Sequence, residues 1–126
     1  MVGIVIVSHS KNLAESIAEF TTLMAAGANV AAAGGTDDGE FGTSFQKIYE
    51  AIDSVYSEDG VILLMDMGSA VMTAEMVLEA YGSDKVVMAD CPVVEGAVVA
   101  TINAQAGMSR QEIMESLKDV GKTAKF

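Results

Sequence analysis

Two segments of the chain are apolar at nearly every position. Val2–Val7 and Val61–Met65 are rich in β-branched and aliphatic residues and show no alternation with polar ones. Such runs are typical of strands that are covered on both faces, as in the centre of a parallel sheet. Asn29–Ala33 and Lys85–Ala89 are weaker candidates of the same kind. The hydrophobic pattern therefore predicts four strands.

The segments between these strands carry apolar residues at helical spacing. The first helix is predicted to begin with Ser10 as its N-cap and to stop at Gly27. The second begins at a capping box of Thr43 and Gln46, and the third stops at Gly82. The predicted apolar faces of these helices are, in order, Leu13, Ile17, Phe20 and Met24; Phe45, Ile48, Ile52 and Val55; and Val71, Ala74, Leu78 and Tyr81.

The last third of the chain adds two helices. Pro92 lies in the first turn of a fourth helix that ends near Gly107, and the final residues form either an edge strand or a frayed end. Ser109 and Glu112 form a capping box for a fifth helix. The alternation of strands and helices predicts an α/β fold in one domain over residues 1–126. It is an open, mainly parallel, four- to five-stranded sheet with helices on both faces.

The charge and the hydrophobicity of the chain limit the kinds of molecule that it can bind. The 126 residues include 18 acidic and 7 basic side chains, which give a formal net charge of −11. This charge argues against binding to nucleic acid or to an anionic membrane surface and favours a basic protein partner. No apolar run approaches the roughly 20 residues that span a bilayer, and the amino terminus lacks a signal-peptide pattern, so we expect a cytoplasmic protein.

Two of the predicted strands end in a side chain suited to proton or phosphoryl chemistry. His9, the only histidine, follows the first strand, and Asp66 follows the third. The carboxyl ends of parallel strands lie on one edge of the sheet, where such folds bind ligands. A carboxylate bonded to one ring nitrogen would fix the tautomer of His9 and leave the other nitrogen free to attack phosphorus. Capping of the next helix is the alternative role of Asp66.

Backbone amides at the start of a helix are suited to bind phosphoryl oxygens. Gly68 and Ser69 open the third helix, and Ser10 opens the first. These three residues are the predicted phosphate-binding residues. The acidic loop Gly34–Gly42 lacks the alternate spacing of a calcium loop, so no metal site is predicted there.

Four short motifs occur in an order and spacing that resemble one family. They are Val-Ser-His-Ser at 7–10, Gly-Gly-Thr-Asp-Asp-Gly at 34–39 with Gly-Thr-Ser at 42–44, Met-Asp-Met-Gly-Ser-Ala at 65–70, and Pro-Val-Val-Glu-Gly-Ala at 92–97. Over essentially the whole chain they resemble DhaM, the phosphotransferase subunit of phosphoenolpyruvate-dependent dihydroxyacetone kinases, within the mannose-type enzyme IIA superfamily.

This resemblance implies a phosphotransferase, usually a homodimer, that holds no tightly bound cofactor. His9 matches the histidine that accepts a phosphoryl group from the phosphocarrier protein HPr, and Asp66 matches the aspartate that holds this histidine in related domains. The phosphohistidine then passes the group to ADP on a partner kinase subunit, and the ATP phosphorylates dihydroxyacetone on a third subunit. Some members carry further phosphocarrier domains, so a chain that ends at Phe126 is expected to be the single-domain form.

Two other functions remain open. With the same fold and histidine, the protein could be the enzyme IIA component of a mannose-type sugar transporter, whose acceptor is a permease component. A signalling receiver domain would instead be phosphorylated on Asp66. Such a domain needs an acidic cluster after the first strand to hold magnesium, and this chain has Ser8-His9-Ser10 there.

Overall fold

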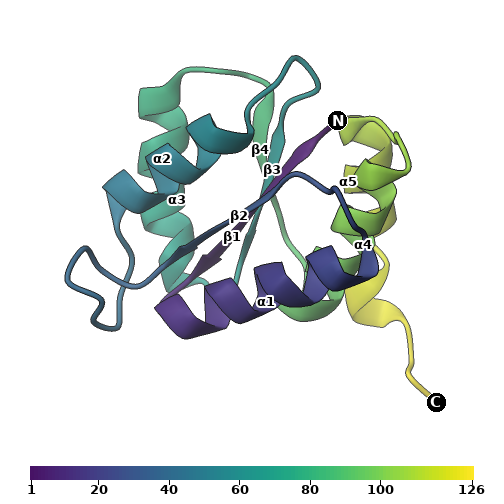
Figure 1. Ribbon diagram of the computed structural model, residues 1–126, viewed down its shortest axis with the longest axis horizontal. Helices are drawn as coiled ribbons and strands as arrows, with labels where there is room; N and C mark the ends of the chain where they lie inside the picture. Colours follow the sequence, from purple (N-terminus) through teal and green to yellow (C-terminus); the bar gives the residue numbers. More distant parts are fainter.

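The computed structural model describes all 126 residues and contains one sheet with helices on both faces (Figure 1). The strands are β1 (Gly3–Ser8), β2 (Val30–Gly34), β3 (Val61–Met65) and β4 (Val86–Ala89). They are hydrogen-bonded in the order β2-β1-β3-β4, and all three pairs are parallel. Every residue of β1 is buried, because β1 has a strand on each side and helices over both faces. The predicted α/β class is confirmed, with four strands.

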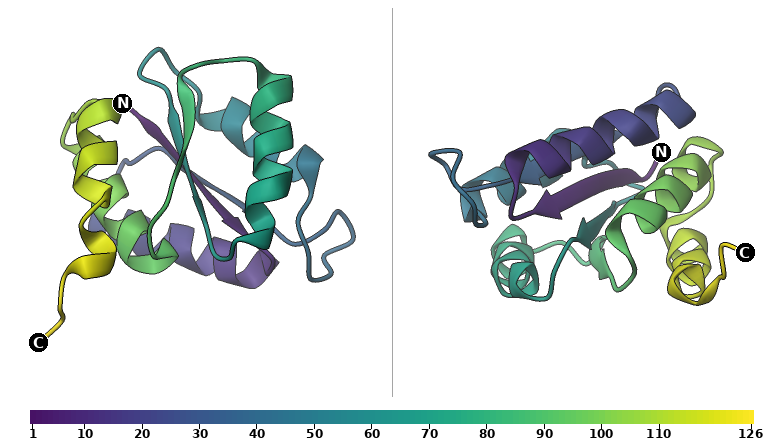
Figure 2. Two further views of the ribbon diagram at one scale, coloured as in Figure 1. Left: turned by 180° about the vertical axis from the view of Figure 1, so that it is seen from behind. Right: turned by 90° about the horizontal axis from the view of Figure 1, so that it is seen from below.

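The helices divide between the two faces of the sheet. They are α1 (Lys11–Met24), α2 (Phe45–Val55), α3 (Ser69–Tyr81), α4 (Val93–Gln105) and α5 (Arg110–Leu117). Ile17 of α1, Ala100 of α4 and Ile113 of α5 belong to one apolar cluster, whereas Ile48 of α2 and Val77 of α3 belong to another. The further views show the sheet between these two groups of helices (Figure 2). Two cores, one on each face, therefore hold the strands in place.

The structure corrects the predicted apolar face of α1. Ile17 is buried as expected, but the rest of its core-facing side is formed by the small residues Ala14 and Thr21. The other members of the predicted face are between 41% and 52% exposed: Leu13, Phe20 and Met24. Small side chains allow α1 to lie close to β2 and α4, against which it packs. The buried face of α1 therefore shares Ile17 with the face predicted from the large apolar residues but is otherwise formed by their small neighbours.

The predicted start of α2 is also shifted by one residue. Ser44, rather than Thr43, is the N-cap, because the Ser44 hydroxyl accepts a hydrogen bond from the Lys47 amide at 3.1 Å. Gln46 does not complete a capping box with Thr43, whose hydroxyl instead contacts Thr73 of α3. This contact links two elements that flank the functional site.

Two further predictions concern α3 and the end of the chain. α3 buries Ala70, Ala74 and Val77, so Ala74 is the one member of its predicted face that is fully buried. Its stop at Gly82 is confirmed by a left-handed backbone conformation there. Of the two alternatives predicted for the carboxyl end, the edge strand does not form, because Val120–Lys122 form a short 3₁₀ helix and no strand follows.

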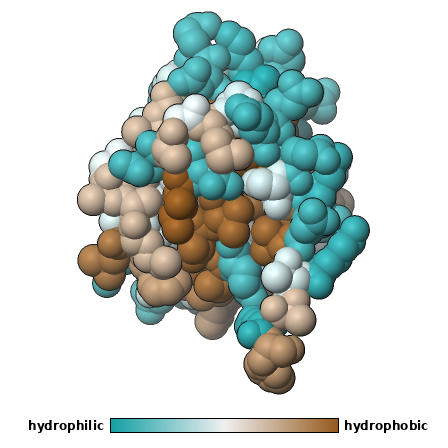
Figure 3. Space-filling model, turned by 90° about the vertical axis from the view of Figure 1, so that its right-hand side faces the viewer, coloured by the Kyte–Doolittle hydropathy of each residue, from teal (hydrophilic) through white to brown (hydrophobic).

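β4 is the open edge of the sheet on the side of the molecule that carries α5. Met88 and Ala89 of β4 line an apolar groove with Met114 and Leu117 of α5. On the face of the molecule that Figure 3 shows, apolar atoms reach the surface in the centre and toward the left, and hydrophilic residues border them above and on the right. Among the helices, none is both long and apolar enough to cross a lipid bilayer.

Candidate functional site

The register of β1 and β3 brings His9 and Asp66 together. Val7 pairs with Met65, so each strand ends at the same level of the sheet. The Asp66 amide continues this pairing and donates a hydrogen bond to the Val7 carbonyl at 3.1 Å. From β1, the chain adds β2 on one side of the sheet and then β3 and β4 on the other. The boundary between β1 and β3 is therefore a topological switch point, where open α/β sheets usually bind their ligands.

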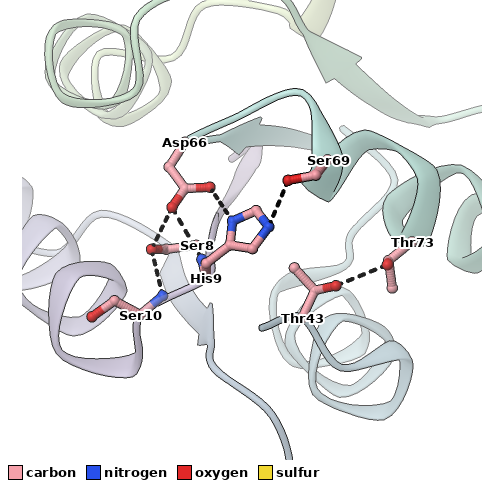
Figure 4. A network of polar contacts seen from close by, with 7 residues as sticks. All are labelled: Ser8, His9, Ser10, Thr43, Asp66, Ser69 and Thr73. Carbon is pink, nitrogen blue, oxygen red and sulfur yellow. Dashed lines mark hydrogen bonds and ion pairs between the residues drawn. The ribbon is translucent and has the colours of Figure 1, made fainter. Parts of the chain in front are cut away.

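Asp66 holds both the backbone and the ring of His9 (Figure 4). Its Oδ1 lies 3.0 Å from His9 Nδ1. Its Oδ2 accepts two hydrogen bonds, from the His9 amide at 3.0 Å and from the Ser8 hydroxyl at 2.8 Å. The carboxylate therefore fixes the position and the rotation of the imidazole together.

These hydrogen bonds keep Asp66 ionised. Partial burial alone would raise the pKa of this carboxyl group, but the bonds from the His9 amide, the His9 ring and the Ser8 hydroxyl outweigh burial and lower the pKa below its usual value. An ionised carboxylate only accepts hydrogen bonds, so the network assigns the ring proton to Nδ1. His9 Nε2 is then unprotonated and keeps its lone pair.

Ser69 contacts the opposite ring nitrogen. The Ser69 hydroxyl lies 2.8 Å from His9 Nε2 and, with the proton of the ring on Nδ1, donates to it. The side chain of His9 is 20% exposed and that of Asp66 is 11% exposed, so the ring lies at the rim of the sheet rather than inside the core. Nε2 therefore combines a fixed lone pair with access for a partner molecule.

The other predicted phosphate-binding residues, Gly68 and Ser10, lie at the starts of α3 and α1. Gly68 precedes α3 as its N-cap residue, and a methyl group at its Cα would meet no other atom within 4 Å. The Ser10 hydroxyl accepts the Leu13 amide at 3.2 Å, and the Ser10 amide donates to the Ser8 hydroxyl at 3.0 Å. Ser10 thus caps α1, as predicted, and a contact of Gly68 or Ser10 with a phosphoryl group stays a prediction.

Sequence reasoning missed the role of Ser8. This fully buried residue donates to Asp66 and accepts from Ser10, so it joins the aspartate to the start of α1. Its position one residue before His9, at the end of a buried strand, is the signal that could have identified it. A polar side chain buried at a strand end needs a partner, and here Asp66 supplies it.

The acidic loop between β2 and α2 uses its side chains for internal contacts. Asp37 accepts a hydrogen bond from Ser44, and the Thr36 hydroxyl accepts one from the Glu40 amide at 3.1 Å. The loop also touches the site, because the Gly42 amide donates to the His9 carbonyl at 2.9 Å. In the structure no three His, Cys, Asp or Glu side chains converge as metal ligands.

Comparison with known proteins identifies the class first. The family model described as "PTS system fructose IIA component" matches residues 3–116. The chain therefore belongs to this family of phosphotransferase-system IIA domains. A crystal structure of the protein EF1359, described as of unknown function, has a TM-score of 0.86 and 28% sequence identity, and the match covers 99% of this chain and 98% of that one.

More similar relatives place the chain within the family more narrowly. The DhaM phosphoryl donor subunit of the PEP-dependent dihydroxyacetone kinase of Escherichia coli K12 is 40% identical over 121 residues, which are 90% of this chain and 26% of that subunit. In Listeria innocua, the DhaM subunit of PEP-dependent dihydroxyacetone kinase 1 is 35% identical over 118 residues, which are 94% of each chain. The chain thus spans about a quarter of the E. coli relative and nearly all of the Listeria one. It is a member of the DhaM group of mannose-type IIA domains.

Proposed function

We propose that this chain is the phosphoryl donor subunit of a dihydroxyacetone kinase and carries the phosphoryl group on Nε2 of His9. The observation that carries the proposal is the pair of contacts on this ring: Asp66 holds the Nδ1 proton, and Nε2 faces Ser69 at the rim of the sheet. The names of the DhaM relatives support the same role.

In the first step, His9 takes the phosphoryl group from a phosphorylated histidine of HPr. The Nε2 lone pair attacks phosphorus, the N–P bond of HPr breaks, and the bonding electrons return to the HPr ring. The ring of His9 gains positive charge as the new bond forms. The Asp66 carboxylate, 3.0 Å from Nδ1, stabilises this charge more in the transition state than in the neutral ring.

The hydroxyl of Ser69 must change partner during this step. Before transfer it donates to Nε2 at 2.8 Å, and that lone pair is the one that bonds phosphorus. Rotation of the Ser69 side chain redirects its proton to a phosphoryl oxygen. The proposed contacts of the other oxygens are the amides of Gly68 and Ser69, which begin a helix of 13 residues. Ser10 is the further phosphate-binding candidate on the α1 side.

In the second step, the group passes to ADP bound on a partner kinase subunit. An oxygen of the terminal phosphate of ADP attacks phosphorus, the bond to Nε2 breaks, and ATP forms while His9 regains its lone pair. The kinase then uses ATP to phosphorylate dihydroxyacetone. The donor chain needs no nucleotide site of its own for this, which agrees with its 7 basic residues against 18 acidic ones. We further propose that it acts as a cytoplasmic homodimer in a single domain.

The proposed function is tested by measuring which molecule accepts the phosphoryl group from His9. The phosphorylated protein is mixed with ADP and a dihydroxyacetone kinase nucleotide-binding subunit, and ATP is quantified. We expect ATP to form in proportion to the phosphohistidine consumed, and none to form with His9→Gln. Transfer to a mannose-type permease component but not to ADP would overturn the proposal in favour of a sugar-transporter IIA domain. That alternative is kept because the matching family model is described as a fructose IIA component.

A further inference from the structure

The loop between β2 and α2, residues 35–43, is built against the backbone of His9. Its Thr36 amide donates to the Glu40 carbonyl at 2.9 Å, and the Gly42 amide donates to the His9 carbonyl at 2.9 Å. Gly42 has a φ of +140°, and a Cβ there would lie 2.8 Å from a methyl group of Thr36. The loop therefore has a defined shape that the transfer steps above do not explain.

The next residue of this loop, Thr43, joins it to α3. The hydroxyl oxygens of Thr43 and Thr73 are 2.8 Å apart, and we call them the hydroxyl pair. Thr73 follows Ser69 by four residues, so both side chains project from the same face of α3. The hydroxyl pair lies on the side of the imidazole that Ser69 contacts (Figure 4).

Three hydrogen bonds connect His9 to the loop, the loop to α3, and α3 back to His9. The Gly42 amide bonds the His9 carbonyl, the hydroxyl pair joins the loop to α3, and Ser69, one helical turn before Thr73, bonds His9 Nε2. No side chain caps the start of α3, and its N-cap residue Gly68 has open space around its Cα. The hydroxyl pair is thus a side-chain contact that ties this end of α3 to the opposite wall of the site.

We propose that the hydroxyl pair is a positioning device for phosphoryl transfer: it holds α3 against the loop so that the Ser69 hydroxyl stays within reach of Nε2. The inference rests on the proposed role of His9. Thr43 and Thr73 act through Ser69 and are positioning residues. Without either hydroxyl, α3 loses its link to the loop, and Ser69 samples positions from which it reaches neither Nε2 nor a phosphoryl oxygen.

The test compares Thr43→Val, Thr73→Val and the double variant in single-turnover phosphorylation by phosphorylated HPr. Loss of one hydrogen bond predicts about fivefold to tenfold slower transfer at saturating HPr, with the half-saturating concentration of HPr unchanged. Because each hydroxyl acts through the other, the double variant should be no slower than either single variant. Thr73→Ser should restore the rate, and Thr22→Val, which removes a hydroxyl bonded to Ala18 within α1, is the matched control.

A second readout does not depend on transfer. The ¹⁵N resonance of His9 Nε2 reports the hydrogen bond from Ser69, and it should shift in Thr43→Val and Thr73→Val but not in Thr22→Val. Folded variants with an unchanged resonance and unchanged rates would overturn the inference, and so would rate losses that add in the double variant. If the wild-type protein is not phosphorylated on His9, the proposed function fails, whereas the resonance still decides whether the hydroxyl pair positions Ser69.

Discussion

Replacement of Asp66 by asparagine tests how the carboxylate controls the ring of His9. Oδ2 of Asp66 accepts two hydrogen bonds, from the His9 amide and the Ser8 hydroxyl, whereas Oδ1 faces only His9 Nδ1. Asparagine has one oxygen and one NH₂ group. In the Oδ2 position, the asparagine oxygen accepts hydrogen bonds from both the His9 amide and the Ser8 hydroxyl, so this orientation is favoured. The NH₂ group then faces His9 Nδ1. The NH₂ group can only donate, so Nδ1 must become the acceptor and Nε2 must carry the proton.

Asp66→Asn is therefore expected to be slower than Asp66→Ala. Alanine removes a charge-assisted hydrogen bond, which contributes about 1.5–3 kcal/mol and corresponds to roughly 10- to 150-fold in rate. Asparagine in addition forces the ring proton onto Nε2. In a serine protease with the same carboxylate–histidine arrangement, this change of tautomer lowers kcat about 10⁴-fold. We expect a loss of about 10³- to 10⁴-fold for Asp66→Asn, measured by rapid-quench single-turnover transfer from HPr.

A matched control separates the tautomer from the loss of charge. Asp53→Asn removes one negative charge from a carboxylate that accepts the Tyr81 hydroxyl at 3.0 Å on the outer surface, and it should leave transfer unchanged. The ¹⁵N spectrum of His9 should show the proton on Nδ1 in the wild type and on Nε2 in Asp66→Asn. Equal rates for Asp66→Asn and Asp66→Ala, or a proton that stays on Nδ1 in Asp66→Asn, would show that Asp66 does not set the tautomer of His9.

Two predictions concern stability. The lowered pKa of Asp66 means that the folded state binds its proton less readily than the unfolded state, so its stabilising contribution is present above about pH 5 and is lost as pH falls through the folded-state pKa. The unfolding free energy of the wild type relative to Asp66→Asn should therefore decrease between pH 5 and pH 3 in urea titrations, and a constant difference would contradict this. In Gly34→Ala, the new methyl group would lie 2.8 Å from Ala14 Cβ and press on the Ser10 carbonyl at the start of α1. We expect a loss of about 1–3 kcal/mol by chemical denaturation, whereas Gly121→Ala, with its nearest contact at 3.4 Å, should be neutral.

The positions of the strands, and the sheet edge where the site lies, were predictable from the sequence. The apolar runs at Val2–Val7 and Val61–Met65 can be stable in water only if both faces are covered, so their central positions followed directly from residue type. His9 and Asp66 were then expected at one sheet edge, and the structure places Nδ1 3.0 Å from the carboxylate. This pairing was predictable because parallel strands align their ends.

The finer geometry was not predictable from the same pattern. α1 packs through Ala14 and Thr21, because close approach between helices and sheet favours small side chains that periodicity rules overlook. The hydroxyls of Ser8, Thr43 and Thr73 have no distinctive spacing in the sequence. Their roles depend on contacts between elements that are far apart along the chain.

Phosphorylation of His9 at Nε2 is tested most directly by intact-mass analysis and peptide mapping after incubation with phosphoenolpyruvate and the general phosphotransferase enzymes. We expect one added phosphoryl group on the peptide that contains His9, labile to acid and stable to alkali, and none on His9→Ala. A phosphoryl group on Asp66 that is lost in alkali, or full labelling of His9→Ala, would contradict it.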